Sequence, residues 1–283
     1  MDSIKDIVKN EWGEELISIK RCSGGSINEV FECNTKNHHF VIKVNEAKWF
    51  PLMFEKEAQG LSLLTSSSFR IPKVLKTGTY QKHSYLMLEY IDDCGKTMNV
   101  SDFGGKLAKL HLLSSDHFGL NHDNYIGSIP QKNKTNKQWS VFYQSMRIEP
   151  LVKKAFDKGE LDISGIRIFD RFYLEFEHLF PKEPPSLLHG DLWQGNVICD
   201  KDSSPVLIDP AVYYGHREMD LAMLLLFGDI SERTIDAYNN IYPLDMHWKN
   251  RTDIHQLYPL LVHLLLFGAS YRKPVEAVVK KYT

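Results

Sequence analysis

Short strand-like runs of apolar residues fill the first third of this chain, and helical spacing of apolar residues takes over afterwards. Five runs predict the strands of one antiparallel sheet: Leu16–Lys20, Val30–Asn34, Phe40–Val44, Lys73–Thr77 and Ser84–Tyr90. Gly24-Gly25 marks the expected turn after the first strand, and Gly78 marks the turn between the last two. One long helix is expected from Pro51 to about Leu64, because proline suits a first helical turn. Its inward-facing residues are expected to be Leu52, Ala58, Leu61 and Leu64.

The pattern after residue 92 is mostly helical. Helices are expected at 101–114, 139–158, 162–180, 216–228, 231–240 and 253–271. A small hairpin, Val197–Cys199 with Val206–Ile208, interrupts them. A strand-rich beginning followed by a helical remainder predicts an α+β protein of two lobes, residues 1–92 and 93–283, with a hinge near 89–95.

Composition and charge narrow the class of protein. The formal charge is −2 and no long basic run is present, so nucleic acid is not an expected partner. The four cysteines lack the paired spacing of a zinc site or a disulfide framework, which is typical of a reducing compartment. The most apolar stretches, Leu221–Phe227 and Leu257–Phe267, are too short to span a membrane. The first twelve residues are too charged for a signal peptide, so a cytoplasmic protein is expected.

The strongest chemical signal is the stretch from Leu188 to Asn196, LHGDLWQGN. It keeps the H-x-D-x-x-x-x-N spacing of the protein-kinase catalytic loop. Phosphoryl transfer needs a carboxylate beside the attacking hydroxyl, for which Asp191 is the candidate, and oxygen ligands for magnesium. Asn196 supplies one such ligand, and Asp209, thirteen residues later, stands where the second metal ligand of a kinase would be. A lone turn of this composition would mean little, but the two spacings and the intervening hairpin together predict a kinase.

The first lobe carries the residues expected to hold ATP. Lys43 ends an apolar strand in the pattern FVIKV and is expected to bind phosphate, paired with Glu57 or Glu55; helical spacing favours Glu57. The backbone of the glycine-rich turn Gly24-Gly25-Ser26 is expected to cover the phosphates. At the hinge, backbone groups of Glu89 and Ile91 are expected to pair with adenine.

Two absences predict a small acceptor molecule. Gly190 replaces the arginine that reads a phosphorylated activation loop in protein kinases, and only ten residues separate Asp209 from Asp220, too few for a peptide-docking segment. A non-catalytic nucleotide-binding module is the rival from another class, and it would be expected to have lost Asp191, Lys43 or Asp209.

These residues resemble the fructosamine 3-kinase, or ketosamine 3-kinase, family over nearly the whole chain. The likeness rests on HGDLWQGN and on further segments, which include Gly24–Ile27, Glu57–Leu61, Asn124–Gly127, Trp139, Phe142, Arg147, Ile208–Ala211, Gly215–Ala222 and Leu257–Leu261 with His263, Phe267 and Tyr271. The resemblance implies ATP- and Mg²⁺-dependent phosphorylation of the 3-hydroxyl of ketosamines, with Asp191 as base, Asn196 and Asp209 as magnesium ligands, and Lys43 with Glu57 as phosphate clamp. Microbial relatives are regarded as ribulosamine or erythrulosamine kinases. Kinases of the same fold that act on choline, aminoglycosides or homoserine remain alternatives.

The acceptor site is the part of the prediction that depends most on single residues. Trp193 occupies a position where serine/threonine kinases carry lysine, and we expect it to support the sugar or the cationic amine, the alternative being burial in the core. His189 is also expected to contact substrate. Ser26 stands where many relatives have cysteine, which puts thiol-based control in doubt. A monomer or weak dimer is expected, with the glycated amine or protein as its partner.

Overall fold

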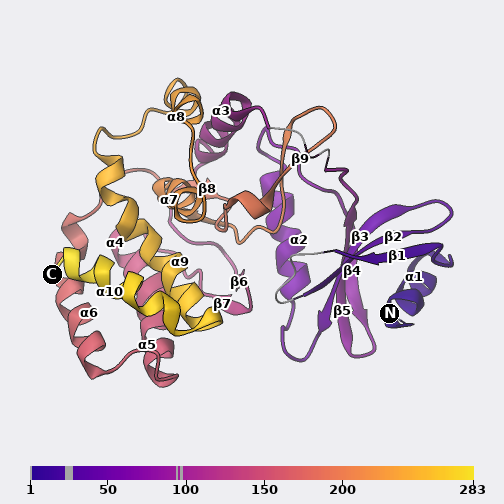
Figure 1. The fold of residues 1–283 in the computed structure, drawn as a ribbon, viewed down its shortest axis with the longest axis horizontal. Helices are drawn as coiled ribbons and strands as arrows, with labels where there is room; N and C mark the ends of the chain where they lie inside the picture. Colours follow the sequence, from indigo (N-terminus) through magenta and orange to yellow (C-terminus); the bar gives the residue numbers. More distant parts are fainter. Residues whose placement is uncertain (1, 23–27, 94, 96–97) are drawn as a thin grey trace.

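The computed structural model describes residues 2–22, 28–93, 95 and 98–283. A twisted sheet with α1 (Asp2–Trp12) lies at one end of the molecule, and most of the helices lie at the other, with α2 (Met53–Leu64) between them (Figure 1). The two-lobed α+β architecture is therefore confirmed. The boundary between residues 92 and 93 stays a prediction. Leu64, the last residue of α2, and Phe69 both belong to the core of the helical lobe, so the first lobe contributes to that core.

Within the described residues, five strands form the sheet of the first lobe, and every neighbouring pair is antiparallel, as predicted. In spatial order they are β1 (Ser18–Arg21), β2 (Glu29–Asn34), β3 (His39–Glu46), β5 (His83–Glu89) and β4 (Val74–Tyr80). The predicted turn at Gly78 is wrong, because Gly78 lies inside β4 opposite Tyr85 and the turn comes at Gln81. A Cβ at Gly78 would lie 2.8 Å from the Tyr85 hydroxyl, so the glycine makes room for that ring.

Helix α2 starts two residues later than predicted. Leu52 adopts the left-handed conformation, with φ 57°, and is 61% exposed, so its predicted inward position is wrong. Leu61 and Leu64 are buried, as expected. Gly60 is buried on the same helix, and a Cβ there would lie 3.1 Å from Cγ2 of Val212, so α2 packs closely on a segment of the helical lobe.

The helical lobe contains the predicted helices with altered ends, together with elements that the sequence did not indicate. Its helices are α3 (Val100–His111), α4 (Trp139–Phe142), a π-helical turn (Tyr143–Ile148), α5 (Glu149–Asp157), α6 (Ile163–Glu175), α7 (Glu218–Leu226), α8 (Glu232–Asn239), α9 (Thr252–Phe267) and α10 (Arg272–Lys281). Short 3₁₀ turns lie at Phe176–His178, Gln194–Asn196, Trp248–Arg251 and Ala269–Tyr271. Its strands are β6 (Asn124–Ile126), β7 (Ile129–Gln131), β8 (Ser186–Leu188), β9 (Val197–Cys199), β10 (Pro205–Leu207) and β11 (Tyr213–Gly215).

The predicted helix at 139–158 is interrupted by the π-helical turn. Pro150 lies at the start of α5 and has no N–H to continue the regular ladder, and Glu149 N–H instead reaches back five residues to the carbonyl of Gln144. The predicted helix at 253–271 ends earlier, at Phe267, because Gly268 takes φ 86°.

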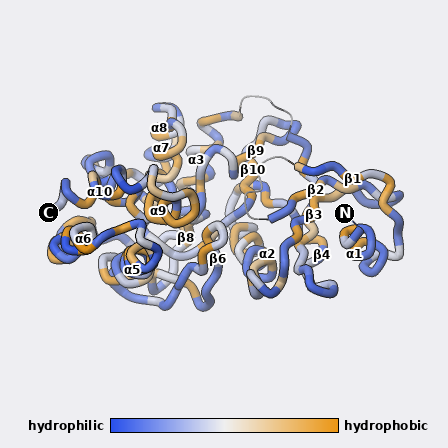
Figure 2. The backbone as a smooth tube through the Cα atoms, turned by 60° about the horizontal axis from the view of Figure 1, so that its bottom comes forward, coloured by the Kyte–Doolittle hydropathy of each residue, from blue (hydrophilic) through white to orange (hydrophobic). Residues whose placement is uncertain are grey.

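The core of the helical lobe surrounds α9, on which ten residues are buried. Apolar positions follow α9 through the middle of this lobe, whereas hydrophilic positions predominate along the outer helix α10 (Figure 2). This buried helix packs against α5, α7 and α10. None of the helices in the described part of the chain is both long enough and apolar enough to cross a membrane.

Candidate active site

The stretch that matches the kinase catalytic loop lies between β8 and β9 and is held through its backbone. The carboxylate of Asp220, on α7, accepts the N–H groups of His189 at 2.8 Å and of Gly190 at 3.0 Å. Gly190 has φ 83°, and a Cβ there would lie 2.1 Å from the carbonyl oxygen of Ala211, so only glycine fits. These contacts fix the direction in which the next residue, Asp191, points.

His189 does not face the substrate side of the loop, contrary to expectation. The side chain is fully buried, and its Nε2 donates to the carbonyl oxygen of Ile208 at 2.9 Å. Burial lowers the pKa of this imidazole, although the charge of Asp220 acts in the opposite direction. His189 therefore joins the catalytic loop to the segment that precedes Asp209, and we assign it a positioning role.

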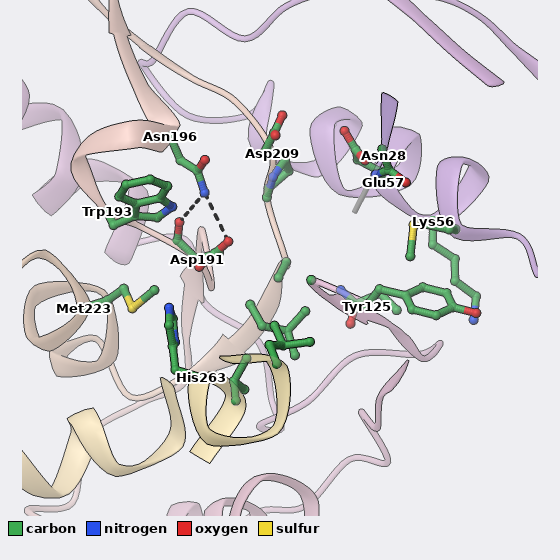
Figure 3. A pocket seen from close by; sticks show the side chains of 18 of the residues that line it. Asn28, Lys56, Glu57, Tyr125, Asp191, Trp193, Asn196, Asp209, Met223 and His263 are labelled. Carbon is green, nitrogen blue, oxygen red and sulfur yellow. Dashed lines mark hydrogen bonds between the residues drawn. The ribbon is translucent and has the colours of Figure 1, made fainter. Parts of the chain in front are cut away.

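Asp191 and Asn196 are in contact and both line the cavity, as predicted. The Nδ2 group of Asn196 donates to the backbone oxygen of Asp191 at 2.8 Å and to its Oδ2 at 3.1 Å (Figure 3). Burial, reinforced by the charge of Asp209, raises the pKa of Asp191 to about 7. A carboxyl group with such a pKa exchanges a proton readily near neutral pH, which is the property required of a general base.

Lys43 lies on β3 with only 5% of its surface exposed, and its Nζ contacts two carboxylates. The distances are 2.6 Å to Oε1 of Glu57 and 2.5 Å to Oδ1 of Asp209. Burial alone would lower the pKa of Lys43, but the two carboxylates outweigh it and raise that pKa above its usual value. The predicted pairing with Glu57 rather than Glu55 is confirmed, and the same ammonium group joins the two lobes.

Asp209 follows β10 in the left-handed conformation, with φ 55°. This conformation is uncommon outside glycine, although Asp tolerates it better than most residues, and it places the carboxylate against Lys43. Asp209 and Asn196 both line the same cavity. A carboxylate and an amide oxygen are hard donors that suit Mg²⁺, so this pair fits a magnesium ion.

A cavity of about 330 Å³ lies between the lobes. Its lining includes Lys43 and Glu57 from the first lobe and Asp191, Asn196 and Asp209 from the second. Trp193 is 40% exposed and faces this cavity, so burial in the core is excluded (Figure 3). The indole lies edge-to-face with Phe227, with ring centroids 6.4 Å apart. A Cβ on Gly195 would lie 2.3 Å from the indole, so that glycine allows the ring to fold back over the loop.

His263, on α9, lines the cavity together with Asp191 (Figure 3), although motif spacing does not mark it as a site residue. Its Nδ1 lies 2.8 Å from the carbonyl oxygen of Pro259. A carbonyl only accepts, so Nδ1 carries the proton and Nε2 is left as an acceptor. Burial lowers the pKa of His263, which favours this neutral form. The sequence marks His263 only through the family resemblance.

The predicted nucleotide-side residues are only partly placed. Gly24, Gly25 and Ser26 lie outside the described residues. Glu89 and Ile91 are described, but neither lines the cavity. The backbone N–H of Glu89 donates to the carbonyl of Lys73, and its carboxylate pairs with Arg70 at 2.8 Å. Contact of the hinge with adenine therefore stays a prediction.

Comparison with known proteins places this geometry in a family. The family model described as fructosamine kinase matches residues 1–283. A probable ketoamine kinase of Enterococcus faecium is 37% identical over 263 residues, covering 92% of this chain and 93% of that protein. A protein-ribulosamine 3-kinase of Arabidopsis thaliana, described as chloroplastic, is 35% identical over 289 residues, covering 99% and 87%.

Solved structures agree. The crystal structure of a candidate fructosamine-3-kinase from Thermobifida fusca superposes with a TM-score of 0.87 at 34% identity, covering 99% of this chain and 98% of the other. The fold is thus the protein-kinase-like fold predicted from the sequence, and the chain is a kinase. On all of these grounds, this chain belongs to the fructosamine kinase family.

Proposed function

We propose that this kinase transfers the γ-phosphoryl group of ATP to the 3-hydroxyl of a ketosamine, the sugar adduct of an amine, with Mg²⁺ as cofactor. The observation that carries the proposal is the pairing, in one cavity, of a carboxyl group with a pKa of about 7, Asp191, with an exposed indole, Trp193. The names of the relatives, ketoamine kinase and ribulosamine 3-kinase, support the acceptor and the position of transfer.

Transfer requires the proton of the attacking hydroxyl to leave as the new bond forms. The sugar oxygen bonds to the γ-phosphorus, its proton passes to the carboxylate of Asp191, and the bond to the β–γ bridging oxygen breaks to release ADP. Asn196 holds Asp191 in place through its two hydrogen bonds. The raised pKa matches this task, because the carboxylate gains affinity for a proton while remaining largely ionised above pH 7.

The nucleotide side is proposed to hold the phosphates. Magnesium, held by Asn196 and Asp209, would neutralise charge on the phosphate oxygens. Lys43, fixed by Glu57, supplies a fixed positive charge on the same side. The backbone of Gly24, Gly25 and Ser26 is proposed to cover the phosphates, and backbone groups of Glu89 and Ile91 to bind adenine.

The acceptor side is proposed to hold the sugar and its amine. The face of Trp193 attracts a cation by about 0.5–2 kcal/mol, depending on desolvation, which suits a secondary ammonium group. The free lone pair of His263 Nε2 can accept a hydrogen bond from a sugar hydroxyl or from that ammonium group.

The test is a coupled assay of ADP release with a panel of acceptors. Lysine adducts of ribulose, erythrulose and fructose are the candidate substrates, and choline, homoserine and kanamycin represent the other kinases of this fold. At least one ketosamine should be turned over at least tenfold faster than every control. Turnover of a control compound without turnover of any ketosamine would overturn the proposal.

A further inference from the structure

A short hairpin, β6 with β7, lines the cavity through residues 124–127 but supplies none of the predicted catalytic residues. It spans Asn124 to Gln131 and turns through Gly127, which has φ 56°. It lies between α2 and the helices of the second lobe (Figure 1). The hairpin can therefore contact both lobes.

On one side the hairpin holds the beginning of α2, the helix that carries Glu57. The hydroxyl of Tyr125 donates to the carbonyl oxygen of Pro51 at 3.0 Å. The ammonium group of Lys56 lies 5.4 Å from the centre of the Tyr125 ring, within the range of a cation–π contact (Figure 3). Both contacts join the two lobes, because Pro51 immediately precedes Leu52 and α2, and Lys56 is the neighbour of Glu57 within that helix.

On its other side the hairpin holds the segment that follows Asp209. The side-chain amide of Gln131 donates to the carbonyl of Ala211 at 3.0 Å, and that of Asn124 donates to the carbonyl of Val212 at 2.9 Å. Both amides are buried, so loss of either bond would leave a buried carbonyl with one partner fewer. This segment takes the place of a protein-kinase activation segment.

The hairpin is itself rigidly held in the core of the helical lobe. Oε1 of Gln131 accepts from the Tyr258 hydroxyl at 2.6 Å. Oδ1 of Asn124 accepts from Gln131 at 2.8 Å and from Asn133 at 2.8 Å. Arg147, fully buried, donates to Oδ1 of Asn133 at 2.7 Å. Each of the buried amides of Asn124 and Gln131 thus has more than one hydrogen-bond partner, and a network of this kind resists rearrangement.

Three elements thus meet around the Lys43 ion pairs. The hairpin contacts α2 and the Asp209 segment, and α2 contacts that segment directly where Gly60 leaves space for Val212. In protein kinases the corresponding lysine–glutamate pair and metal-binding Asp must both be in place, and phosphorylation of the activation loop controls this.

We propose that the β6–β7 hairpin is a built-in clamp that positions Glu57 and Asp209 together. Tyr125 positions α2, while Asn124 and Gln131 position the segment after Asp209. Assembly of the nucleotide side then requires no phosphorylation. The inference goes beyond the proposed function, because it concerns the apoprotein and does not depend on which acceptor is phosphorylated.

The first test compares Tyr125→Phe with Tyr282→Phe, a matched loss of one hydroxyl near the C-terminus, where Tyr282 bonds to Asp253. Amide hydrogen exchange of the apoprotein is followed by mass spectrometry. Tyr125→Phe should speed exchange over residues 53–57 by about 2- to 10-fold, the range for loss of one hydrogen bond. It should weaken calorimetric binding of Mg-AMP-PNP by a similar factor. Tyr282→Phe should change neither quantity.

The second test compares Gln131→Met with Gln256→Met, since Gln256 also donates to a backbone carbonyl, that of Ala222. Gln131→Met should speed exchange over residues 209–213, where Ala211 N–H bonds to His189, and the control should not. Should Gln131→Met fail to fold, the tyrosine pair alone decides the outcome. Unchanged exchange in α2 and unchanged nucleotide affinity in Tyr125→Phe would overturn the clamp, even if its melting temperature fell.

Discussion

The cavity is lined by two aspartates, Asp209 and Asp191, whose carboxylates lie in opposite electrostatic environments. On the nucleotide side, Asp209 lies against the ammonium group of Lys43, which Glu57 also contacts. On the proposed acceptor side, Asp191 has an amide partner, Asn196, and lines the cavity together with apolar and aromatic side chains that include Trp193. Its pKa is raised by burial to about 7. One carboxylate is thus prepared to bind positive charge, and the other to take a proton.

In the proposed mechanism, environment rather than residue type divides the work between two aspartates whose side chains line one cavity. Each substitution below removes the property of one side and should leave the other side intact.

The largest effect is expected from Asp191→Asn. An amide cannot take the proton of the attacking hydroxyl, so kcat should fall by about 100-fold or more. Binding of Mg-AMP-PNP, measured by calorimetry, should stay within about twofold of the wild-type value, because Asp191 belongs to the acceptor side. Loss of nucleotide binding in this variant would mean that the two sides are not separate.

Asp209→Asn should act on the other side. Removal of a charged ligand weakens the hold on a divalent metal, so the Kd for Mg-AMP-PNP should rise by about tenfold or more. The half-saturating Mg²⁺ concentration should rise with it, and excess Mg²⁺ should restore part of the activity. Unchanged metal dependence would remove Asp209 from the metal site.

The pH dependence of the free energy of unfolding should also reflect the environment of Asp191. The pKa of Asp191 is about 7 in the folded protein and about 3.9 in an unfolded chain, so its ionised form destabilises the folded state. Asp191→Asn should therefore raise the free energy of unfolding of the apoprotein by roughly 1–3 kcal/mol at pH 8. This gain should shrink as the pH falls through 7 and vanish below about pH 4.

Urea unfolding at pH 5 and pH 8 measures the difference. The exposed Asp236→Asn on α8 is the control, and its unfolding free energy should not change between these pH values relative to wild type. If Asp191→Asn were destabilising at pH 8, the raised pKa would be wrong.

The smallest effect is expected from Trp193→Phe. A phenyl ring offers a weaker face to a cation than an indole, so the KM for a ketosamine should rise about two- to fivefold while the KM for ATP stays the same. Because Trp193 is 40% exposed, the melting temperature should hardly move. A lower melting temperature with a normal KM would show that the indole serves packing instead.

The sequence was sufficient for those parts of the site in which chemistry depends on spacing within a short stretch. Asp191 and Asn196 are five residues apart on one loop, and the pairing of Lys43 with Glu57 follows from a strand and the helix after it. The five-stranded sheet was predictable because its runs are long enough to show apolar periodicity.

The β6–β7 hairpin and the orientations of Arg147 and His189 could not be predicted, because they depend on tertiary contacts. Strands β6 and β7 have three residues each, too few for any periodicity, and their role lies in side-chain bonds to residues about 80 positions away. Arg147 was marked only by the family resemblance, which does not show that its guanidinium stacks on Tyr213 in the core, 3.9 Å from the ring centre. His189 matched a motif, but the motif does not show whether its ring faces the cavity or the core.

The most direct test of the account is the identity of the product. Ribulose-lysine and ATP would be incubated with the enzyme and Mg²⁺, and the product analysed by ³¹P–¹H correlation NMR. The expected product is a phosphate ester coupled to the proton on C3, formed together with one equivalent of ADP and absent with Asp191→Asn. A phosphate on another carbon, or release of free phosphate from ATP without any phosphorylated sugar, would contradict it.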